Sequence, residues 1–222
     1  MKRITTGSLL ISLQLLFACH SGGQVQKDYN IHFRSGTYLP VENVREVMGT
    51  PQLLSASRFN GVYYTILQFY SLPDSAVRAT LAKNGVRLLH YLPQLAYVAA
   101  IPVETKLSFL KNINARSLFA LTAEQKMAPE LKKMNFPAWA VPQKGYVDLA
   151  VSTFETFDLL LLEKSISLLN GQVSNVQKEF ATLTVRMPQK NLVSLAQLPF
   201  IFWVEVVEEP AKPETSLKNQ EQ

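Results

Sequence analysis

The chain has 222 residues, of which 47% are apolar and 18% are charged, and its formal net charge is +5. This composition is typical of a globular protein with enough apolar residues for two small cores, and it excludes an intrinsically disordered chain. The positive charge does not predict a nucleic-acid partner. The Lys and Arg residues between positions 61 and 133 are spread along the chain and are not clustered with stacking aromatics.

The first 19 residues have the features of an export signal. Lys2 and Arg3 form a basic start, and Leu9–Phe17 is an apolar run too short to span a bilayer permanently. The string LFAC at positions 16–19 resembles the lipobox of bacterial lipoproteins, in which the cysteine becomes the lipidated first residue. We therefore expect residues 1–19 to be a lipoprotein-type signal peptide and Cys19 to be lipidated. The alternative is an ordinary secretory signal, cut after a small residue such as Gly23.

Either signal predicts an exported chain. With the lipid anchor at Cys19 the chain is held on a membrane of the bacterial cell envelope, in the periplasm or at the outer membrane, and without it the chain is secreted. Cys19 is the only cysteine. The mature fold is therefore expected to contain no internal disulfide bond and to be stabilised by packing alone.

Residues 20–60 lack sustained hydrophobic periodicity, and we interpret them as a tether and lead-in. The next block, residues 61–128, reads as strand, helix, strand, strand, helix, strand. Asp74 begins its first helix, where a carboxylate suits the exposed amide groups, and Gly85 ends that helix. The six segments are YYTILQF, LPDSAVRATLAKNG, VRLLHYL, LAYVAAIP, VETKLSFLKNI and RSLFALT.

Residues 129–143 are interpreted as a linker, and residues 144–208 repeat the same order of elements. Asp158 and Gly171 take the places of Asp74 and Gly85, and both blocks have a proline just before the second helix. The tail 209–222 combines prolines with mixed charges and is expected to be extended or disordered. The six segments of the second block are YVDLAVS, TFDLLLLEKSISLLNG, QVSNV, ATLTVRMP, QKNLVSLAQLP and FIFWVEVV.

These two blocks, called here the first repeat (61–128) and the second repeat (144–208), predict a duplicated α+β fold. We expect two tandem ferredoxin-like βαββαβ domains, each a four-stranded antiparallel sheet with two helices on one face. The other face of each sheet is then either wet or covered by a partner.

The two open sheet faces differ in polarity. Aligning Gly61 with Gly145, and Pro102 with Pro188, sets four apolar residues of the first repeat opposite polar or small ones of the second. In the first repeat these are Tyr64, Ile66, Val98 and Ala100, and in the second they are Asp148, Ala150, Thr184 and Arg186. An apolar sheet face needs a cover. The second repeat, the segment before residue 60, or another protein can provide it.

Catalytic motifs are absent from the sequence. Of the three histidines, His20 adjoins the signal, His32 lies in the lead-in, and His90 is in a strand, where a structural role is expected. No His or Cys spacing matches a metal site, and there is neither a phosphate-binding glycine loop nor a G-x-S-x-G elbow. We therefore expect a non-enzyme without metal or cofactor.

The first repeat resembles the N-terminal prodomain of secreted bacterial subtilisin-like serine peptidases. The resemblance rests on a strand ending in Gln-Phe at Ile66–Phe69, a helix end and strand at Leu81–Leu88, and YLPQLAY at Tyr91–Tyr97. The second repeat shares only the order of elements. Such propeptides lay the open sheet face on two helices of the peptidase and pass their tail through its active-site cleft. The peptidase domain itself is missing, so the chain is either a truncated precursor or acts on a separate enzyme.

Two functional hypotheses follow. In the first, the chain is a non-catalytic double prodomain that binds a subtilisin-like serine peptidase as inhibitor or folding chaperone, with Tyr64, Ile66, Val98 and Ala100 as the docking face. In the second, it is a lipid-anchored interaction or assembly module of the cell envelope without a peptidase partner, and the two sheets pack on each other.

Overall fold

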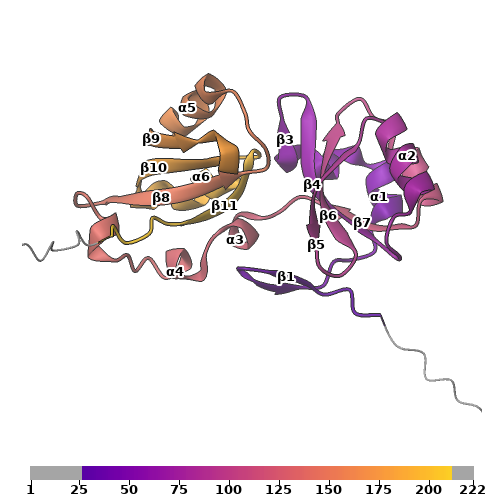
Figure 1. The fold of residues 1–222 in the computed structure, drawn as a ribbon, viewed down its shortest axis with the longest axis horizontal. Helices are drawn as coiled ribbons and strands as arrows, with labels where there is room; N and C mark the ends of the chain where they lie inside the picture. Colours follow the sequence, from indigo (N-terminus) through magenta and orange to yellow (C-terminus); the bar gives the residue numbers. More distant parts are fainter. Residues whose placement is uncertain (1–26, 212–222) are drawn as a thin grey trace, which may run out of the picture.

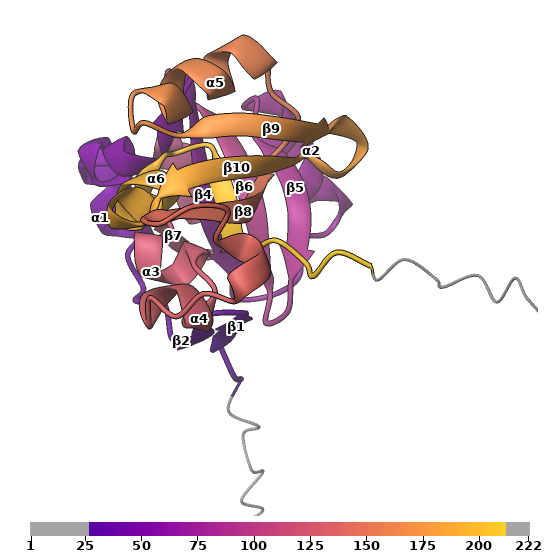
Figure 2. The ribbon, with the colours of Figure 1, turned by 90° about the vertical axis from the view of Figure 1, so that its left-hand side faces the viewer.

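The computed structural model describes residues 27–211, which form an α+β fold with antiparallel sheets in two halves (Figure 1). The signal segment with Cys19, and most of the tail, lie outside the described residues. Turning the molecule by 90° shows the strands of the second sheet running across those of the first (Figure 2). No described helix has the length and hydropathy needed to cross a membrane.

The lead-in is structured over its described part. It forms the hairpin β1 (Ile31–Phe33) and β2 (Gly36–Tyr38), helix α1 (Val44–Gly49), the 3-10 helix η1 (Pro51–Ser57) and the short strand β3 (Arg58–Phe59). Val47 and Leu54 are buried in the core of the first repeat. Residues 27–60 are thus an integral part of the first half and not a plain tether. Their elements are too short to produce a visible period in the sequence.

The first repeat contains the predicted elements in the predicted order. They are β4 (Val62–Phe69), α2 (Ser75–Lys83), β5 (Arg87–Leu92), β6 (Ala96–Pro102), η2 (Leu107–Asn112) and β7 (Ala115–Phe119). Strand β4 pairs with β6 on one side and with β7 and β3 on the other, and β5 pairs with β6. The predicted second helix is shorter than expected. Only Leu107–Asn112 are helical, and they form a 3-10 helix.

The last strand of the first repeat and the first strand of the second are connected through α3 (Ala123–Lys126), α4 (Pro129–Lys132) and η3 (Ala138–Ala140). Thr122 caps α3 in a reciprocal capping box with Gln125. Leu131 and Ala140 are buried in the core of the second repeat, so the expected linker 129–143 packs on that repeat.

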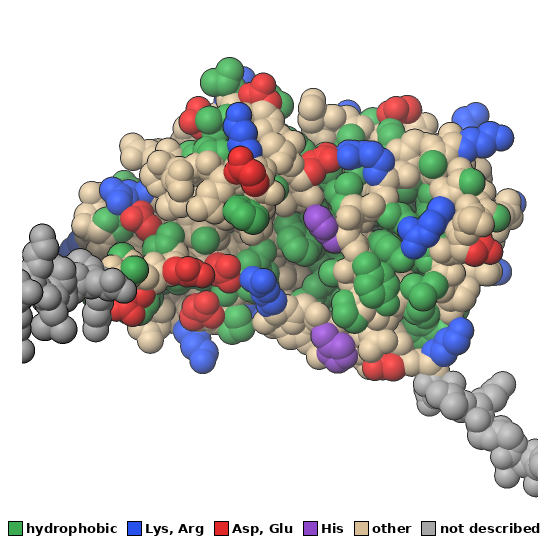
Figure 3. Space-filling view, in the orientation of Figure 1, with side chains coloured by type: hydrophobic (Ala, Val, Ile, Leu, Met, Phe, Trp, Pro, Cys, Tyr) green, Lys and Arg blue, Asp and Glu red, His purple; other side chains and the backbone are tan. Residues whose placement is uncertain are grey.

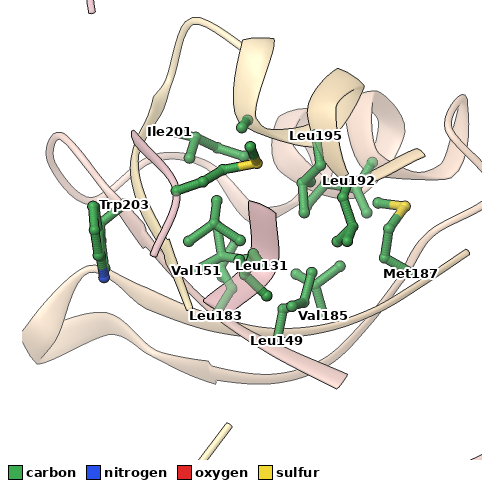
Figure 4. Packing of buried hydrophobic residues seen from close by; sticks show 14 of the residues in the cluster. Leu131, Leu149, Val151, Leu183, Val185, Met187, Leu192, Leu195, Ile201 and Trp203 are labelled. Atoms are coloured by element: carbon green, nitrogen blue, oxygen red, sulfur yellow. The ribbon is translucent and has the colours of Figure 1, made fainter. Parts of the chain in front are cut away.

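The second repeat consists of β8 (Tyr146–Thr153), α5 (Leu159–Ser167), β9 (Gln172–Gln177), β10 (Thr182–Pro188), α6 (Leu192–Gln197) and β11 (Ile201–Val206), with the 3-10 turns η4 (Lys178–Phe180) and η5 (Gln189–Asn191). Its strand order is β11-β8-β10-β9. Val151, Leu183 and Val185 point from the sheet towards Leu192 and Leu195 of α6 (Figure 4). The inward residues alternate with outward polar ones, as predicted.

The first helices of both repeats begin at the expected carboxylates. Asp74 accepts a hydrogen bond from the amide of Val77, and Asp158 accepts one from Leu160, each at 2.8 Å. The helix ends differ. Gly85 adopts a positive φ of 73° that favours glycine, whereas at Gly171 a Cβ would meet Met187 Cε at 2.6 Å.

Candidate functional site

The four residues of the predicted docking face come together in the central strands of the first sheet. Tyr64 pairs with Ala100, and Ile66 with Val98, so all four share the face opposite α2. They are nevertheless covered, since none exposes more than 3% of its surface. The sequence alignment of the two repeats is confirmed here, because Asp148 pairs with Arg186 and Ala150 with Thr184 at the equivalent places.

Two internal segments cover this face. Phe154, Phe157 and Phe202 reach over from the second repeat, and Ile31 and Phe33 from the β1–β2 hairpin, to form one apolar cluster with the face. The ring of Phe154 stacks on Tyr64 with centroids 5.3 Å apart. We refer to this cluster as the inter-repeat core.

The expectation of a docking face open to a peptidase is therefore corrected. Tyr64, Ile66, Val98 and Ala100 are occupied by internal packing, so a partner reaches them only if the two halves separate. The sequence left open whether the second repeat, the lead-in or another protein is the cover. The first two both contribute.

A polar network joins the halves at the edge of the inter-repeat core. Arg87 of β5 donates two hydrogen bonds to the carboxylate of Glu155, at 2.6 and 2.9 Å, and the hydroxyl of Tyr64 donates a third. The hydrogen bond from Arg87 lowers the pKa of Glu155, with a further contribution from Tyr64. Burial, followed by the bond to Glu155, raises the pKa of Tyr64 above its ordinary value. The tyrosine therefore stays a neutral donor, and the glutamate a charged acceptor.

The equivalent face of the second sheet remains partly open. Arg186 donates two hydrogen bonds to Asp148, at 2.8 and 2.9 Å, across β10 and β8. The side chain of Arg186 is 41% exposed and that of Asp148 is 20% exposed. A cross-strand ion pair thus stands where the first repeat has Tyr64 and Ala100.

A cavity of about 260 Å³ lies between the β1–β2 hairpin, the end of β5 and the second sheet. Hydrophobic side chains occupy the depression between the halves (Figure 3). The guanidinium of Arg34 stands at its rim, 5.8 Å from the ring of Trp203 and 3.4 Å from Glu205. The lining residues are His32, Phe33, Arg34, Leu92, Leu121, Gln125, Ser152, Phe202 and Trp203.

Lys126 is a buried cation that no pattern in the sequence indicates. It is 3% exposed, donates to the carbonyl of Leu198 at 3.1 Å, and has its ammonium 5.9 Å from the ring of Phe154. Burial lowers its pKa to about 8. In sequence Lys126 is an ordinary polar residue of a short capped helix, and only the packing of α3 between the two halves distinguishes it.

The described residues hold no cluster of His, Cys, Asp and Glu able to bind a metal ion. His32 contacts the Thr37 hydroxyl at 3.0 Å across the hairpin, and His90 lies 6.4 Å from the ring of Phe202. Both described histidines therefore have structural neighbours. The other histidine, His20, lies outside the described residues.

One family model matches part of the chain. It is that of a domain of unknown function, DUF8729, and it covers residues 32–122. The matched range runs from the β1–β2 hairpin to the cap of α3, and so includes most of the described lead-in and most of the first repeat. No curated protein and no solved structure matches the chain.

Proposed function

We propose that both halves are ferredoxin-like βαββαβ repeats. Numbering the strands within each repeat, both sheets have the order fourth, first, third, second, as in β7-β4-β6-β5 and β11-β8-β10-β9, with every pairing antiparallel. The first repeat departs from the pattern at its second helix, η2. It also carries the added β3 and the lead-in.

On this architecture, we propose that the chain is a non-catalytic interaction module of the bacterial cell envelope, exported and held there by lipid at Cys19. The observation that carries the proposal is the inter-repeat core. The face that a propeptide would present to its peptidase is used to join the two halves into one body, so this chain's partner surface lies elsewhere.

The partner surface that fits best is the cavity beside β5, and its occupant is an extended segment of a partner polypeptide. Among the described residues β5 pairs only with β6, which leaves its other edge for strand addition. Leu92 ends this strand and lines the cavity together with Phe202 and Trp203. An extended segment bonded along β5 therefore places an apolar side chain in the cavity.

Site-directed photo-crosslinking in cells tests this surface. A photo-reactive phenylalanine analogue at Leu92 is expected to give a discrete adduct with a partner polypeptide. The same analogue at Leu168, which is 78% exposed at the end of α5, serves as the control. No adduct at Leu92, or the same adducts at both positions, contradicts the proposal.

The variant Cys19→Ser is expected to release the chain from the membrane fraction.

The propeptide function is a second candidate, and the open face of the second sheet favours it. Asp148 and Arg186 leave that face accessible, and β9, at the edge of the second sheet, pairs with β10 alone among the described strands. On this hypothesis the second repeat lies on the helices of a subtilisin-like serine peptidase. The measurement is hydrolysis of a chromogenic peptide by such an enzyme. Stoichiometric inhibition that is lost in Arg186→Glu but kept in Lys164→Glu supports it, and the absence of inhibition or chaperone effect counts against it.

A further inference from the structure

A second cavity, of about 410 Å³, lies in the first half on the side of α1 and β7. Its volume is in the range of small-ligand pockets, roughly 300–1,000 Å³. It is separate from the inter-repeat core and from the cavity beside β5, since it shares no lining residue with either. The lining residues are Glu42, Val44, Arg45, Tyr70, Lys111, Asn114, Ala115 and Arg116.

Arg116 is the buried centre of this cavity. Its side chain is 9% exposed, and its Nη1 donates to the carbonyl of Pro40, to Gln68 Oε1 and to Ser117 Oγ at 2.8 to 3.0 Å. The guanidinium carbon lies 4.4 Å from the centre of the Tyr29 ring. One edge of the guanidinium is thus fixed by neutral acceptors and an aromatic ring, which position the charge without neutralising it.

The Nε atom of Arg116 is buried and has no hydrogen-bond partner among the described residues. The nearest carboxylate oxygen is Glu42 Oε1, at 3.8 Å, which is too long for a hydrogen bond. The side chain of Glu42 is 59% exposed, so it is a loosely held counter-ion. A buried guanidinium with an N–H that lacks an acceptor is costly, and the charge of an anion in the cavity would offset part of that cost.

The charges around the cavity are unbalanced. Arg45, Lys111 and Arg116 supply three positive charges, and Glu42 is the only acid in the lining. Arg45 and Lys111 are both exposed and can turn towards a ligand, whereas Arg116 is fixed. Lys27 lies nearby, with its ammonium 2.9 Å from the carbonyl of Tyr70. The surplus of two charges matches a doubly charged anion.

We propose that this cavity binds a phosphate group, with Arg116 as the fixed cation of its wall and Arg45 and Lys111 as the mobile cations. Guanidinium groups suit phosphate because their planar donors pair with its oxygens. The volume leaves room for an organic group on the phosphate, so the ligand is either free phosphate or a phosphate monoester. This site does not depend on the interaction function proposed above.

Isothermal titration calorimetry on the whole mature protein tests the proposal, with inorganic phosphate, glycerol 3-phosphate and acetate at matched ionic strength. Phosphate is expected to bind more tightly than acetate. Arg45→Gln and Lys111→Gln are each expected to weaken phosphate binding about threefold or more, which is the effect of losing one partly exposed charge. Lys164→Gln on α5 removes the same charge far along the chain and should leave binding unchanged.

Glu42→Gln is the sharpest variant, because it removes the competing carboxylate and is expected to tighten phosphate binding. Arg116 variants are less informative, since Nη1 holds three bonds and their loss affects the fold. Tighter binding of glycerol 3-phosphate supports the site with an organic phosphate as ligand, and equal binding supports it with free phosphate. The proposal is overturned if wild type does not bind phosphate, if acetate binds as tightly, or if Lys164→Gln weakens binding as much as Lys111→Gln.

Discussion

The two repeats have the same strand order but opposite uses for their open sheet faces. In the first, the cross-strand pair Tyr64 and Ala100 is buried beneath aromatic rings of the other half. In the second, the equivalent pair Asp148 and Arg186 forms a partly exposed ion pair. The same strand order therefore supports both an apolar contact face and a wet face. Which of the two forms depends on the few side chains that point to that face of the sheet.

Because of this difference, the first half needs contacts from outside its own sheet to bury its apolar face, and the second half does not. The first repeat leaves an apolar face that must be covered, and the lead-in and three phenylalanines of the second half provide the cover. The second repeat has its core closed by α5, α6 and the segment around Leu131. We infer that the first half depends on the second for stability more than the reverse.

A lysine introduced at equivalent positions of the two sheets is expected to destabilise the protein by very different amounts. Ile66→Lys places a charge in the inter-repeat core, where Ile66 is fully buried, and is expected to cost about 4 kcal/mol or more. Ala150→Lys at the matching position of the second sheet lies beside Glu205 and is expected to cost less than about 1 kcal/mol. Urea denaturation of both variants measures the two costs, and equal losses would refute the inequality of the faces.

Replacing Lys126 should stabilise the junction of the halves. Because burial lowers the pKa of this lysine to about 8, the folded state carries the cost of the charge at neutral pH. Lys126→Met is therefore expected to raise the free energy of unfolding by about 2 kcal/mol at pH 7. The carbonyl of Leu198 still accepts from the amide of Ile201.

The sign of the pH effect provides the check on Lys126. Between pH 8 and the ordinary pKa of 10.5, the unfolded chain retains a proton that the folded chain has lost, so the stability of the wild type rises with pH. The advantage of Lys126→Met should shrink over that range. An advantage that is constant from pH 7 to 10 would show that the charge of Lys126 is not its cause.

The polar network at the edge of the inter-repeat core should have a smaller and stabilising effect, with its pH dependence in the acid range instead of the alkaline range. Glu155→Gln weakens the bonds from Arg87 and Tyr64 and is expected to cost about 1 kcal/mol at pH 7. The folded-state pKa of Glu155 is lowered, so this contribution is fully present above its ordinary value of 4.5 and is lost as pH falls below it. Thermal melts of both proteins should therefore differ most at pH 7, and the difference should shrink between pH 4.5 and pH 3.

The ion pair on the second sheet should contribute least. Arg186→Gln removes the two bonds to Asp148 on a face that water reaches, so the melting temperature is expected to fall less than in Glu155→Gln. The difference from wild type should also shrink in high salt, because salt screens exposed pairs. A larger loss than that of Glu155→Gln would mean that the second face is a structural contact as well.

Much of the fold could be predicted because its signals are local. Asp74 and Asp158 cap helices through amides two or three residues away, and Gly61 and Gly145 mark the start of equivalent strands. The elements of residues 27–60 cannot be predicted from the sequence, because they are short and are buried only by packing against the first repeat. The second helix of that repeat was predicted too long for the same reason, since its six-residue 3-10 turn depends on packing through Leu107 and Leu110.

The order of strands and helices in each half and the polarity of each sheet face follow from the sequence, because element type and side-chain alternation are local signals. The cover of the apolar face emerges only when the chain folds, because Phe154, Phe202 and Ile31 come from distant parts of the chain. The burial of Lys126 and Arg116 likewise depends on contacts between distant parts of the chain. A side chain's exposure depends on neighbours far away in the sequence, and no local pattern records them.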